Sequence, residues 1–517
     1  LSDTDDDNFL AASDTVTITA AFDEAMTSTP TISIANTSIS NEVMTKIIGG
    51  IGTGSTSLLG SELVGIPNGN QSKDMDFGWS VSMSSDGSIV AIGAQRKYAN
   101  GRQQGEVKVY RFQSGAWVQL GQSIEGGSFS DYTNKHPQAG RSVSLSSDGT
   151  RLAIGFSGVN SVLIFDLNNN NQWTLVGGII EGDDESSFGN SVSMSSDGNR
   201  VAIGAPKYNK VRRTNGSSFV YGGQVRIYEY QVISGTATWT QLGTDINGST
   251  INSTYDFYGD LTGHSVSLSG DGSKVAIESI GKSRNQGLPH VQVFEYTPSG
   301  VSSWTQLGQT LGSGSSLAND GGHAVSLSFD GSRVVVGRAN AIPGNVDIYD
   351  YTPSGSTSWT QVGPIIGNIG QPGINNDDDK IGWSVSISSD GSRIAIGGRE
   401  SLLGGAVEIW QSKIISGTTT WTQIGSDILA DGSGDQFGYS VSLSGDGTKV
   451  AIGGTEYDAS SYTQNWNQPN EGHVRIYSIT ESEAYEYLWD VDSGGAPSDG
   501  TYRATVAGAD KAGNAYS

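Results

Sequence analysis

The sequence predicts an all-β protein, a seven-bladed β-propeller inserted into a split β-sandwich. Two observations carry this prediction: one strand–turn–strand motif recurs seven times along the middle of the chain, and short alternating strands flank the array on both sides. The composition agrees with them, because 73 of the 517 residues are glycine and Ser, Thr and Asn are abundant. Such a composition is typical of chains built from many short strands and tight turns.

The repeated motif is a β-hairpin. Its seven copies read FGWSVSMSSDGSIVAIGA from Phe77, AGRSVSLSSDGTRLAIGF from Ala139, FGNSVSMSSDGNRVAIGA from Phe188, TGHSVSLSGDGSKVAIES from Thr262, GGHAVSLSFDGSRVVVGR from Gly321, IGWSVSISSDGSRIAIGG from Ile381 and FGYSVSLSGDGTKVAIGG from Phe437. The first half alternates small polar and apolar residues with the period of a strand. Asp-Gly then supplies the positive φ that a tight hairpin needs.

Each repeat has room for two further strands. The turn aspartates Asp86, Asp148, Asp197, Asp271, Asp330, Asp390 and Asp446 are separated by 62, 49, 74, 59, 60 and 56 residues. A third strand is visible at Val107–Tyr110, Val225–Tyr228, Val346–Tyr349 and Val474–Tyr477, and a fourth begins at Trp117, Trp173, Trp239, Trp304, Trp359 and Trp421. Because the tryptophans recur at one position, we interpret them as blade-packing residues. Four antiparallel strands in each of seven repeats predict a seven-bladed propeller.

The ends of the array predict how the ring closes. The seventh repeat lacks a Trp-Thr-Gln strand after Val474–Tyr477, whereas an orphan segment at residues 57–66 precedes the first repeat and resembles residues 421–429. We therefore expect residues 57–66 to complete the last blade, which would leave no open sheet edge.

The flanks predict a second domain that the propeller interrupts. Alternating strands are expected at residues 15–22, 30–35, 485–491 and 500–506. Neither flank alone could bury a sheet face, but together they would form most of a small sandwich. The predicted domains are residues 1–46 and 482–517, the two sandwich halves, and residues 47–481, the propeller. The ends of a closed propeller lie in one blade, which makes such an insertion reasonable.

The repeats resemble the FG-GAP type of propeller repeat found in integrin alpha chains and bacterial surface proteins, with Phe-Gly retained at Phe77, Phe188 and Phe437. The flanks resemble the bacterial Ig-like modules of giant RTX-type adhesins, through the segments from Ser13, Phe22 and Ala507. The resemblance implies a split Ig-like sandwich, a place on the bacterial cell surface and a role in cell adhesion and biofilms. Integrin-type repeats often carry a calcium loop between the first two strands, but here a bare Ser-Asp-Gly hairpin stands there.

Charge and composition exclude several classes of function. The 29 Lys and Arg against 53 Asp and Glu leave a net charge of −24, which disfavours nucleic acid and anionic membrane surfaces as partners. Zero cysteine excludes disulfides and thiolate chemistry. No apolar run is long enough to insert into a membrane. The first residue is Leu and no signal peptide is visible, so we expect a piece of something longer. We also expect a monomer.

The sequence offers no catalytic constellation. The histidines, His136, His264, His290, His323 and His473, form no metal-protease pattern, and neither a nucleophile elbow nor a Walker loop occurs. Carboxylate pairs such as Asp183 and Asp184 lie in acidic loops beside others like them. We therefore expect no catalytic residues.

One position varies where its neighbours do not. The residue between Gly and Ser-Val at the start of each first strand is Trp79, Arg141, Asn190, His264, His323, Trp383 or Tyr439. The first strand is innermost in a propeller, so we expect these residues to ring the mouth of the central channel. Aromatic and hydrogen-bonding groups at a concave mouth suit a polar ligand such as a sugar; the alternative is that they only fill the channel entrance.

The loops after the second strands should lie on the same face. They bring further candidates for ligand binding, Arg338, Arg399, Tyr208, Tyr457 and Trp466. Clustered basic residues in so acidic a chain would attract anionic groups, although ordinary solvated loops are the alternative.

Calcium is the expected cofactor. Asp3, Asp5, Asp6 and Asp7 form an acidic run that would repel itself without a hard cation, and Asp510 lies in a loop that could face the same end. The resemblance implies that calcium would stiffen the joints between neighbouring Ig-like domains of the same chain. The alternative is a solvated linker.

The sequence as a whole favours the ligand-binding region of a secreted bacterial adhesin. Its partner would be a glycan or a protein on another cell. A structural or protein–protein platform is the second hypothesis, and a polysaccharide-active enzyme is the third.

Overall fold

A computed structural model provides the structure of the chain, which divides into two compact units. One consists of residues 57–411 and 427–478, the other of residues 1–56, 412–426 and 479–517. The structure describes residues 31–34, 42–43, 45–48, 54–65, 76–99, 101–129, 135–212, 219–252, 257–281, 289–298, 303–312, 324–339, 344–353, 358–363, 366–367, 380–399, 404–415, 418–432, 434–456, 471–480, 485–488, 504–509 and 515–516.

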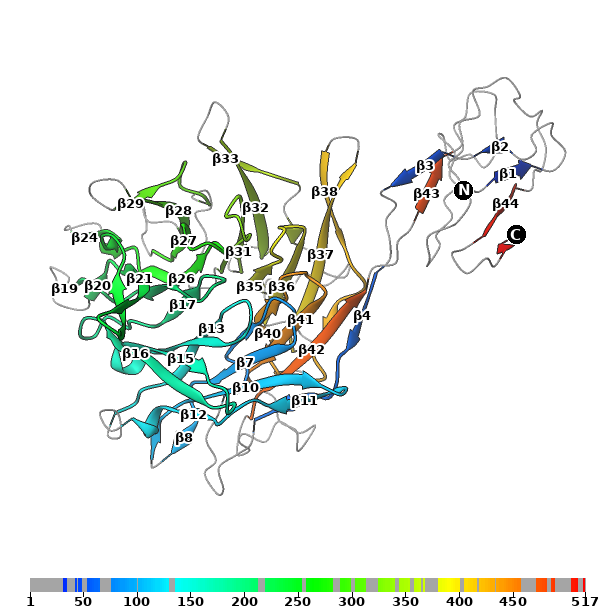
Figure 1. The fold of residues 1–517 in the computed structure, drawn as a ribbon. Helices are drawn as coiled ribbons and strands as arrows, with labels where there is room; N and C mark the ends of the chain where they lie inside the picture. Colours follow the sequence, from blue (N-terminus) through cyan, green and yellow to red (C-terminus); the bar gives the residue numbers. More distant parts are fainter. Residues whose placement is uncertain are drawn as a thin grey trace. The chain divides into compact units, whose positions relative to one another are not determined.

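The described strands between residues 55 and 480 form a seven-bladed β-propeller, and each blade is an antiparallel sheet (Figure 1). Blade 1 consists of β6 (Ser80–Met83), β7 (Ile89–Ala94), β10 (Glu106–Gln113), β11 (Ala116–Gln119) and the short β12 (Ile124–Glu125). Blade 2 consists of β13 (Ala139–Leu145), β14 (Arg151–Phe156), β15 (Ser161–Leu167) and β16 (Trp173–Glu181). Blade 3 consists of β17 (Ser191–Met194), β18 (Arg200–Ala205), β21 (Gln224–Ile233), β22 (Thr236–Gln241) and β23 (Ile246–Asn247).

The other four blades repeat this order of strands. Blade 4 consists of β26 (Thr262–Leu268), β27 (Lys274–Ser279), β28 (His290–Thr297) and β29 (Ser303–Gln306). Blade 5 consists of β30 (Val325–Leu327), β31 (Arg333–Arg338), β32 (Asn345–Thr352), β33 (Ser358–Gln361) and β34 (Ile366–Gly367). Blade 6 consists of β35 (Ile381–Ile387), β36 (Arg393–Gly398), β37 (Ala406–Ile415), β38 (Thr418–Gln423) and β39 (Ile428–Leu429). Blade 7 consists of β40 (Phe437–Leu443), β41 (Lys449–Gly454), β42 (His473–Thr480), β4 (Ser55–Leu58) and β5 (Leu63–Val64).

Small hairpins and short helices lie in the loops between the strands of the blades. The hairpins are β8 (Tyr98–Ala99) with β9 (Arg102–Gln103), β19 (Lys210–Arg212) with β20 (Phe219–Tyr221), and β24 (Thr250–Asn252) with β25 (Phe257–Gly259). The 3-10 helices η1 (Gly126–Ser128) and η3 (Ser157–Val159) follow the same pattern of short loop elements.

The N-terminal segment closes the ring, as the sequence predicted. The strand β4 is hydrogen-bonded to β42, and β5 pairs with the start of the same strand, with Val64 opposite His473. The hydroxyls of Ser57 and Ser478 lie 2.7 Å apart across this pairing. Blade 7 is therefore built from both ends of the array.

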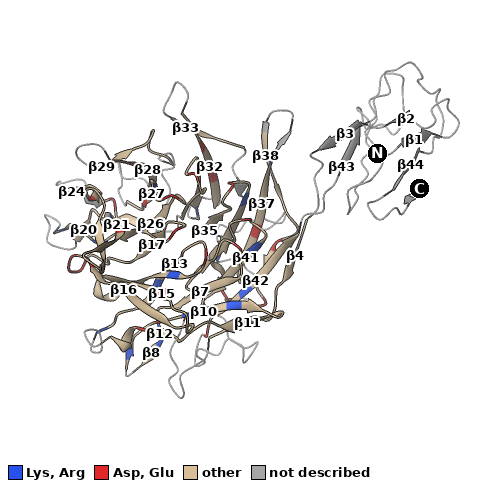
Figure 2. Ribbon diagram, in the orientation of Figure 1, with Lys and Arg blue, Asp and Glu red and all other residues tan. Residues whose placement is uncertain are grey.

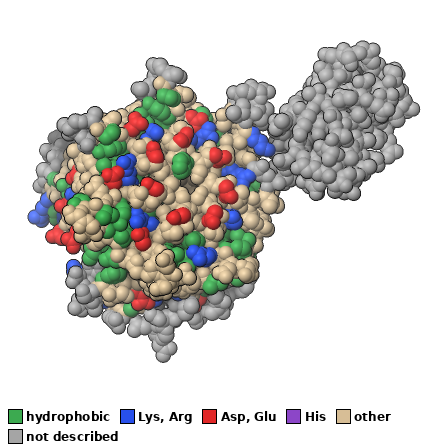
Figure 3. Space-filling view, in the orientation of Figure 1, with side chains coloured by type: hydrophobic (Ala, Val, Ile, Leu, Met, Phe, Trp, Pro, Cys, Tyr) green, Lys and Arg blue, Asp and Glu red, His purple; other side chains and the backbone are tan. Residues whose placement is uncertain are grey.

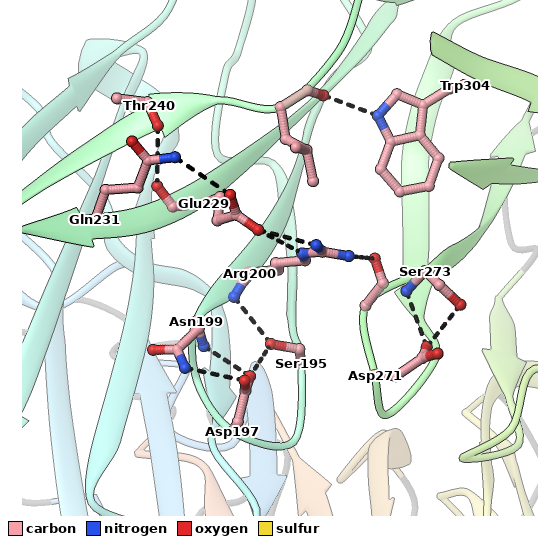
Figure 4. A network of polar contacts seen from close by, with 12 residues as sticks. Ser195, Asp197, Asn199, Arg200, Glu229, Gln231, Thr240, Asp271, Ser273 and Trp304 are labelled. Atoms are coloured by element: carbon pink, nitrogen blue, oxygen red, sulfur yellow. Dashed lines mark hydrogen bonds and ion pairs between the residues drawn. The ribbon is translucent and has the colours of Figure 1, made fainter. Parts of the chain in front are cut away.

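The Ser-Asp-Gly turns are structural hairpins that bind their own backbone. In blade 3, the hydroxyl of Ser195 donates to Asp197, which also accepts from the backbone N–H and the side-chain amide of Asn199 (Figure 4). Burial alone would raise the pKa of Asp197, but these hydrogen bonds outweigh it, and the pKa lies below its usual value. The same arrangement recurs in the other six turns.

Adjacent turns are joined by a closed ring of backbone hydrogen bonds. The residue before each turn aspartate donates its N–H to the carbonyl of the matching residue in the next blade, at 2.7–3.0 Å. We call these residues the turn ring: Ser85, Ser147, Ser196, Gly270, Phe329, Ser389 and Gly445. The last bond, from Gly445 to Ser85, returns to the first blade, so the circle contains seven members.

A second circle of hydrogen bonds between blades lies next to the turn ring on the innermost strands. In every blade a backbone N–H, such as that of Leu145, donates to a serine hydroxyl of the preceding blade, such as that of Ser82, at 2.9–3.2 Å. The repeated serines therefore fasten neighbouring blades, and this explains why the motif retains them.

The recurring tryptophans fasten the outer strands, which confirms their interpretation as packing residues. The indole N–H of Trp173, which is buried, donates to the carbonyl of Leu120 in the preceding blade at 2.9 Å. The Trp117, Trp239, Trp304 and Trp359 side chains make the equivalent bond. A Cβ on Gly121 would lie 2.7 Å from the Trp173 ring, so glycine is required where the tryptophan of the next blade approaches.

The hydrophobic core lies between the blades. Each cluster joins the central strands of two neighbours, as where Leu145 and Leu152 of blade 2 pack with Val107 and Val109 of blade 1. Because each second strand is sandwiched between two blades, it is buried along almost its whole length.

The strands outside the propeller pair across the two flanks. The strand β1 (Thr31–Ile34) pairs with β44 (Ala504–Ala509) in a sheet that also contains β2 (Glu42–Val43) and β45 (Ala515–Tyr516). A second pair joins β3 (Thr45–Ile48) and β43 (Tyr485–Leu488). Three of the four expected flank strands are present, and the fourth, at residues 15–22, lies outside the described residues. N-terminal and C-terminal segments thus share sheets.

Charged residues are interspersed over the propeller strands (Figure 2). On the face drawn in Figure 3, acidic and basic side chains alternate on a mostly uncharged surface, and hydrophobic side chains form small separate groups. In the described part of the chain, no helix has the length and apolar character needed to span a membrane.

Candidate functional site

The variable position at the start of each first strand is presented by a tight turn. In blade 2 the backbone N–H of Arg141 donates to the carbonyl of Gln138, and the intervening Gly140 has a φ of 84°. A Cβ on Gly140 would lie 2.9 Å from the Glu106 carbonyl oxygen, so only glycine fits there. The same turn precedes Trp79, Asn190, Trp383 and Tyr439. The turn therefore fixes the backbone at this position, whereas the side chain differs from blade to blade.

Contacts link six of these positions in the order of the blades. The rings of Trp383 and Tyr439 have centroids 5.7 Å apart, and those of Tyr439 and Trp79 are 4.5 Å apart. The Arg141 guanidinium lies 4.8 Å from the Trp79 ring centroid and donates from Nε to Asn190 Oδ1 at 3.1 Å.

The chain of contacts continues through Asn190, whose side-chain amide donates to the His264 carbonyl at 3.1 Å. We call Trp79, Arg141, Asn190, His264, Trp383 and Tyr439 the mouth ring. All six are half-buried. The seventh predicted member, His323, lies outside the described residues.

Residues from the ends of the second strands join the mouth ring. The Arg399 guanidinium lies 3.6 Å from the Trp383 ring centroid. The Arg96 guanidinium lies 5.7 Å from the Trp79 ring and 3.3 Å from a carboxylate oxygen of the buried Asp76. The mouth ring therefore opens on the side of the loops that follow the second strands, opposite the Ser-Asp-Gly turns.

Burial changes the protonation equilibria of two members of the mouth ring. It raises the pKa of Tyr439 well above its usual value, so the phenol remains neutral at physiological pH. It lowers the pKa of Arg141, but a guanidinium still retains its proton at neutral pH. The aromatic part of the mouth is therefore uncharged and carries fixed cations beside it.

One carboxylate that the sequence analysis did not select contacts a member of the mouth ring. The side chain of Glu278 is fully buried, and one of its oxygens lies 3.1 Å from His264 Nδ1. Its other oxygen has no hydrogen-bond partner among the described residues.

The position of Glu278 is reserved for glycine in the other six blades. A Cβ on those glycines would lie 2.0–2.3 Å from a carbonyl oxygen of the next blade. The available signal was the change from Ala-Ile-Gly to Ala-Ile-Glu in the fourth repeat. Asp76 and Gln95, which also contact the site, carried no such signal.

Two other predicted binding residues are engaged elsewhere. Arg338 forms an ion pair of 2.7 Å with Asp347 inside blade 5, where both side chains are mostly buried. Tyr208 packs on the core of blade 3, with the Arg226 guanidinium 6.0 Å from its ring. No described contact joins either residue to the mouth ring. Tyr457 and Trp466 lie outside the described residues.

The expected calcium ligands Asp3, Asp5, Asp6, Asp7 and Asp510 also lie outside the described residues. Within the part that the structure describes, no group of three or more His, Asp or Glu side chains is arranged to hold a metal ion. The calcium site stays a prediction.

A cavity of about 530 Å³ lies at the seam between two blades, on the side of the Ser-Asp-Gly turns. Its lining includes Arg200, Glu229 and Asp271, between blades 3 and 4. Arg200 pairs with Glu229 at 2.9 Å and donates to the carbonyl of Gly272 at 3.2 Å (Figure 4). Because Arg200 and Glu229 pair with each other and Asp271 accepts hydrogen bonds within its own turn, the mouth ring is the stronger candidate site.

Comparisons with known proteins show likeness of fold only. The structure is similar to hydrazine synthase of Kuenenia stuttgartiensis, with 15% identity over 75% of this chain and 96% of that one and a TM-score of 0.43. It is similar to the periplasmic gluconolactonase of Pseudomonas aeruginosa, with 15% identity over 71% and 98% of the chains and a TM-score of 0.39. The WD40 repeats of RRP9 match with 12% identity over 82% and 100% and a TM-score of 0.44.

No protein-family model matches the chain, and no curated protein matches it either. The propeller is therefore established by its own strand order, and the function has to be argued from the site.

Proposed function

We propose that this chain is the ligand-binding region of a secreted bacterial cell-surface adhesin. It holds a glycan or another polar surface ligand at the mouth ring and does not convert it. The single observation that carries the proposal is the contact chain of the mouth ring, in which the variable positions of six blades lie side by side on a frame that otherwise repeats.

The chemistry of the mouth ring supports recognition of a sugar. Trp79, Tyr439 and Trp383 form a continuous group of aromatic rings, which we call the aromatic wall. Aromatic faces pack on the apolar faces of pyranose rings, and convergent amide and guanidinium groups bind their hydroxyls. Asn190, Gln95 and Arg141 provide such groups beside the wall.

The setting of the propeller supports an extracellular role. The resemblance of the repeats to FG-GAP propellers and of the flanks to Ig-like adhesin modules implies a rod that presents the propeller. Calcium at the N-terminal aspartates would stiffen that rod.

Two other functions follow from the same fold. A protein–protein platform would use the loop face without sugar specificity, as propellers often do. A polysaccharide-active enzyme needs an acid and a base on opposite sides of a glycosidic bond. The described carboxylates near the mouth, Asp76 and Glu278, are engaged with Arg96 and His264 respectively, which makes the enzyme the weaker alternative.

A glycan-array screen of the whole chain, with and without calcium, tests the proposal. We expect binding to a restricted set of glycans that is lost in Trp79→Ala. The matched control is Phe329→Ser, which changes an exposed aromatic side chain in the turn ring and should leave binding intact. Absence of sugar binding under both conditions would favour the platform, and release of reducing ends from polysaccharides would favour the enzyme.

A further inference from the structure

Arg141 contacts no carboxylate within the described structure; Asp76, which pairs with Arg96, acts on its charge only from beyond ion-pair distance. Its guanidinium donates to Asn190 Oδ1 from Nε and Nη2, at 3.1 and 3.0 Å, and to Gln95 Oε1 from Nη1 at 3.3 Å. These acceptors are neutral amide oxygens. No ion pair joins Arg141 to a carboxylate among the described residues.

Other arginines of the propeller behave differently. Arg151, Arg200 and Arg333 each pair with a carboxylate on the neighbouring strand, at 2.5–2.9 Å. Even Arg96, whose side chain is 44% exposed, reaches Asp76. In a protein with a net charge of −24, these four arginines therefore contact carboxylates, whereas Arg141 in the mouth ring contacts amide oxygens.

Such an arrangement favours a ligand that brings its own negative charge. Removing a cation from water without an opposite charge costs free energy, which a bound anion recovers. Of the five N–H groups of a guanidinium, three are used in the bonds above, so two remain to form charge-assisted bonds with a carboxylate or sulfate.

The aromatic wall determines what accompanies the anion. The centroid of the Trp79 ring lies 4.8 Å from the Arg141 guanidinium and 4.5 Å from the centroid of the Tyr439 ring. An anionic group on Arg141 would therefore lie next to the aromatic wall and near the amides of Asn190 and Gln95. A pyranose ring with an acidic substituent matches this combination better than a flexible acidic peptide.

We propose that the mouth ring selects an acidic saccharide, a sugar bearing a carboxylate or sulfate, and that Arg141 recognises its charge. This inference rests on the proposed function, because it specifies the ligand class of the same site. Arg141 acts as a specificity-determining residue, and the aromatic wall supplies binding that is independent of charge.

Titration calorimetry with the whole chain tests the inference through matched pairs of sugars. The probes are oligogalacturonate against galacto-oligosaccharide, 3′-sialyllactose against lactose, and sulfated against plain lactose. We expect at least tenfold tighter binding of an acidic member than of its neutral partner, and a preference that falls as salt rises. The galacturonate, sialyl and sulfated arms identify which acidic group is preferred.

The variant Arg141→Gln should bring the acidic and neutral sugars to within about threefold of each other, since it removes the charge-assisted bonds. The matched control is Arg111→Gln in β10, at the turn-side end of blade 1 opposite Val118, which should keep the full preference. Equal binding of acidic and neutral sugars by the unchanged protein would overturn the inference but leave the proposed function standing.

Failure of every sugar to bind would overturn both proposals. Tighter binding of an acidic peptide of equal charge would overturn the saccharide assignment. The comparison of sugars and the salt dependence use the unchanged protein, so they decide the inference even if Arg141→Gln does not fold.

Discussion

The two ends of the innermost strands differ in what the repeat holds constant. On the turn side, the turn ring joins all seven blades through backbone groups, and the circle of serine hydroxyls next to it is complete as well. On the mouth side, serine-to-glycine bonds between blades are present at five described seams, and the residues beside them are of five types.

The contrast shows how a repeated frame separates stability from recognition. Where blades are joined through side-chain hydroxyls, serine recurs in all seven blades, whereas the turn ring uses backbone groups alone and tolerates Ser, Gly and Phe. Where the turn supplies the backbone geometry on its own, the side chain contributes little to the frame and is free to diverge. Substitutions on the two sides should therefore have opposite profiles, large effects on stability in the frame and large effects on binding at the mouth.

The largest expected effect is on the frame. Trp173→Ala removes a buried indole and leaves a cavity between blades 1 and 2, so the free energy of unfolding should fall by about 3–5 kcal/mol. Urea unfolding followed by circular dichroism measures the change. Trp173→Phe keeps most of the ring and loses the bond to Leu120, so its loss should be smaller, and equal losses in the two variants would contradict the packing role.

The next effect is a dependence of stability on pH. Burial in blade 6 raises the pKa of Glu408 to about 7, although the Trp410 indole donates to the carboxylate at 2.9 Å. The folded-state pKa lies above the unfolded value of 4.5, so this contribution to stability is complete below pH 4.5 and is lost as pH rises through 7. The effect of Glu408→Gln on the free energy of unfolding, relative to the unchanged protein, should therefore be more favourable at pH 8 than at pH 4.5, by up to about 3 kcal/mol.

The readout is the difference in urea midpoints between the variant and the unchanged protein at the two pH values. A pH-independent difference would show that Glu408 is ionised and solvated in the folded state. On the turn side, Asp→Asn changes act in the opposite sense, because those pKa values are lowered.

At the mouth, binding should change more than stability. Trp79→Ala removes the ring of the aromatic wall that contacts Arg141, and we expect a loss of sugar affinity of about tenfold to a hundredfold. The urea midpoint should change much less than in Trp173→Ala, because Trp79 is only half-buried. Full affinity in the Trp79 variant would contradict a contribution of the aromatic wall to sugar binding.

The smallest effect belongs to a single turn. Asp148→Ala removes the acceptor for Ser146 and for the backbone and hydroxyl of Thr150. Because Asp148 is exposed, we expect a loss of about 1 kcal/mol and no change in sugar binding. The loss should diminish as pH falls through the lowered pKa of Asp148, where the native carboxylate is protonated and the bonds are lost in the unchanged protein too.

The frame could be predicted from the sequence because most of its constraints recur from blade to blade. The Ser-Asp-Gly turns, the packing tryptophans and the closing strand at residues 57–66 all recur or have a visible gap to fill. The short strands β12, β23 and β39 were not predicted, since they are two residues long and carry no alternation.

The site was predictable only in part, because its partners occur once. The mouth ring follows from a variable column that lies between an invariant glycine and the repeated first strand. The pairing of Arg338 with Asp347 does not, because a lone arginine at a strand end gives no indication of which carboxylate it will meet. Glu278 was visible as a broken glycine column, but its contact with His264 needed the fold.

A crystal structure of the chain soaked with oligogalacturonate or 3′-sialyllactose tests the central claim most directly. We expect a sugar ring that packs on Trp79 and Tyr439, with its acidic group bound to Arg141, and an unchanged turn ring. A sugar bound on the turn side, or at the seam between blades 3 and 4, would contradict the claim that recognition lies at the mouth of the propeller.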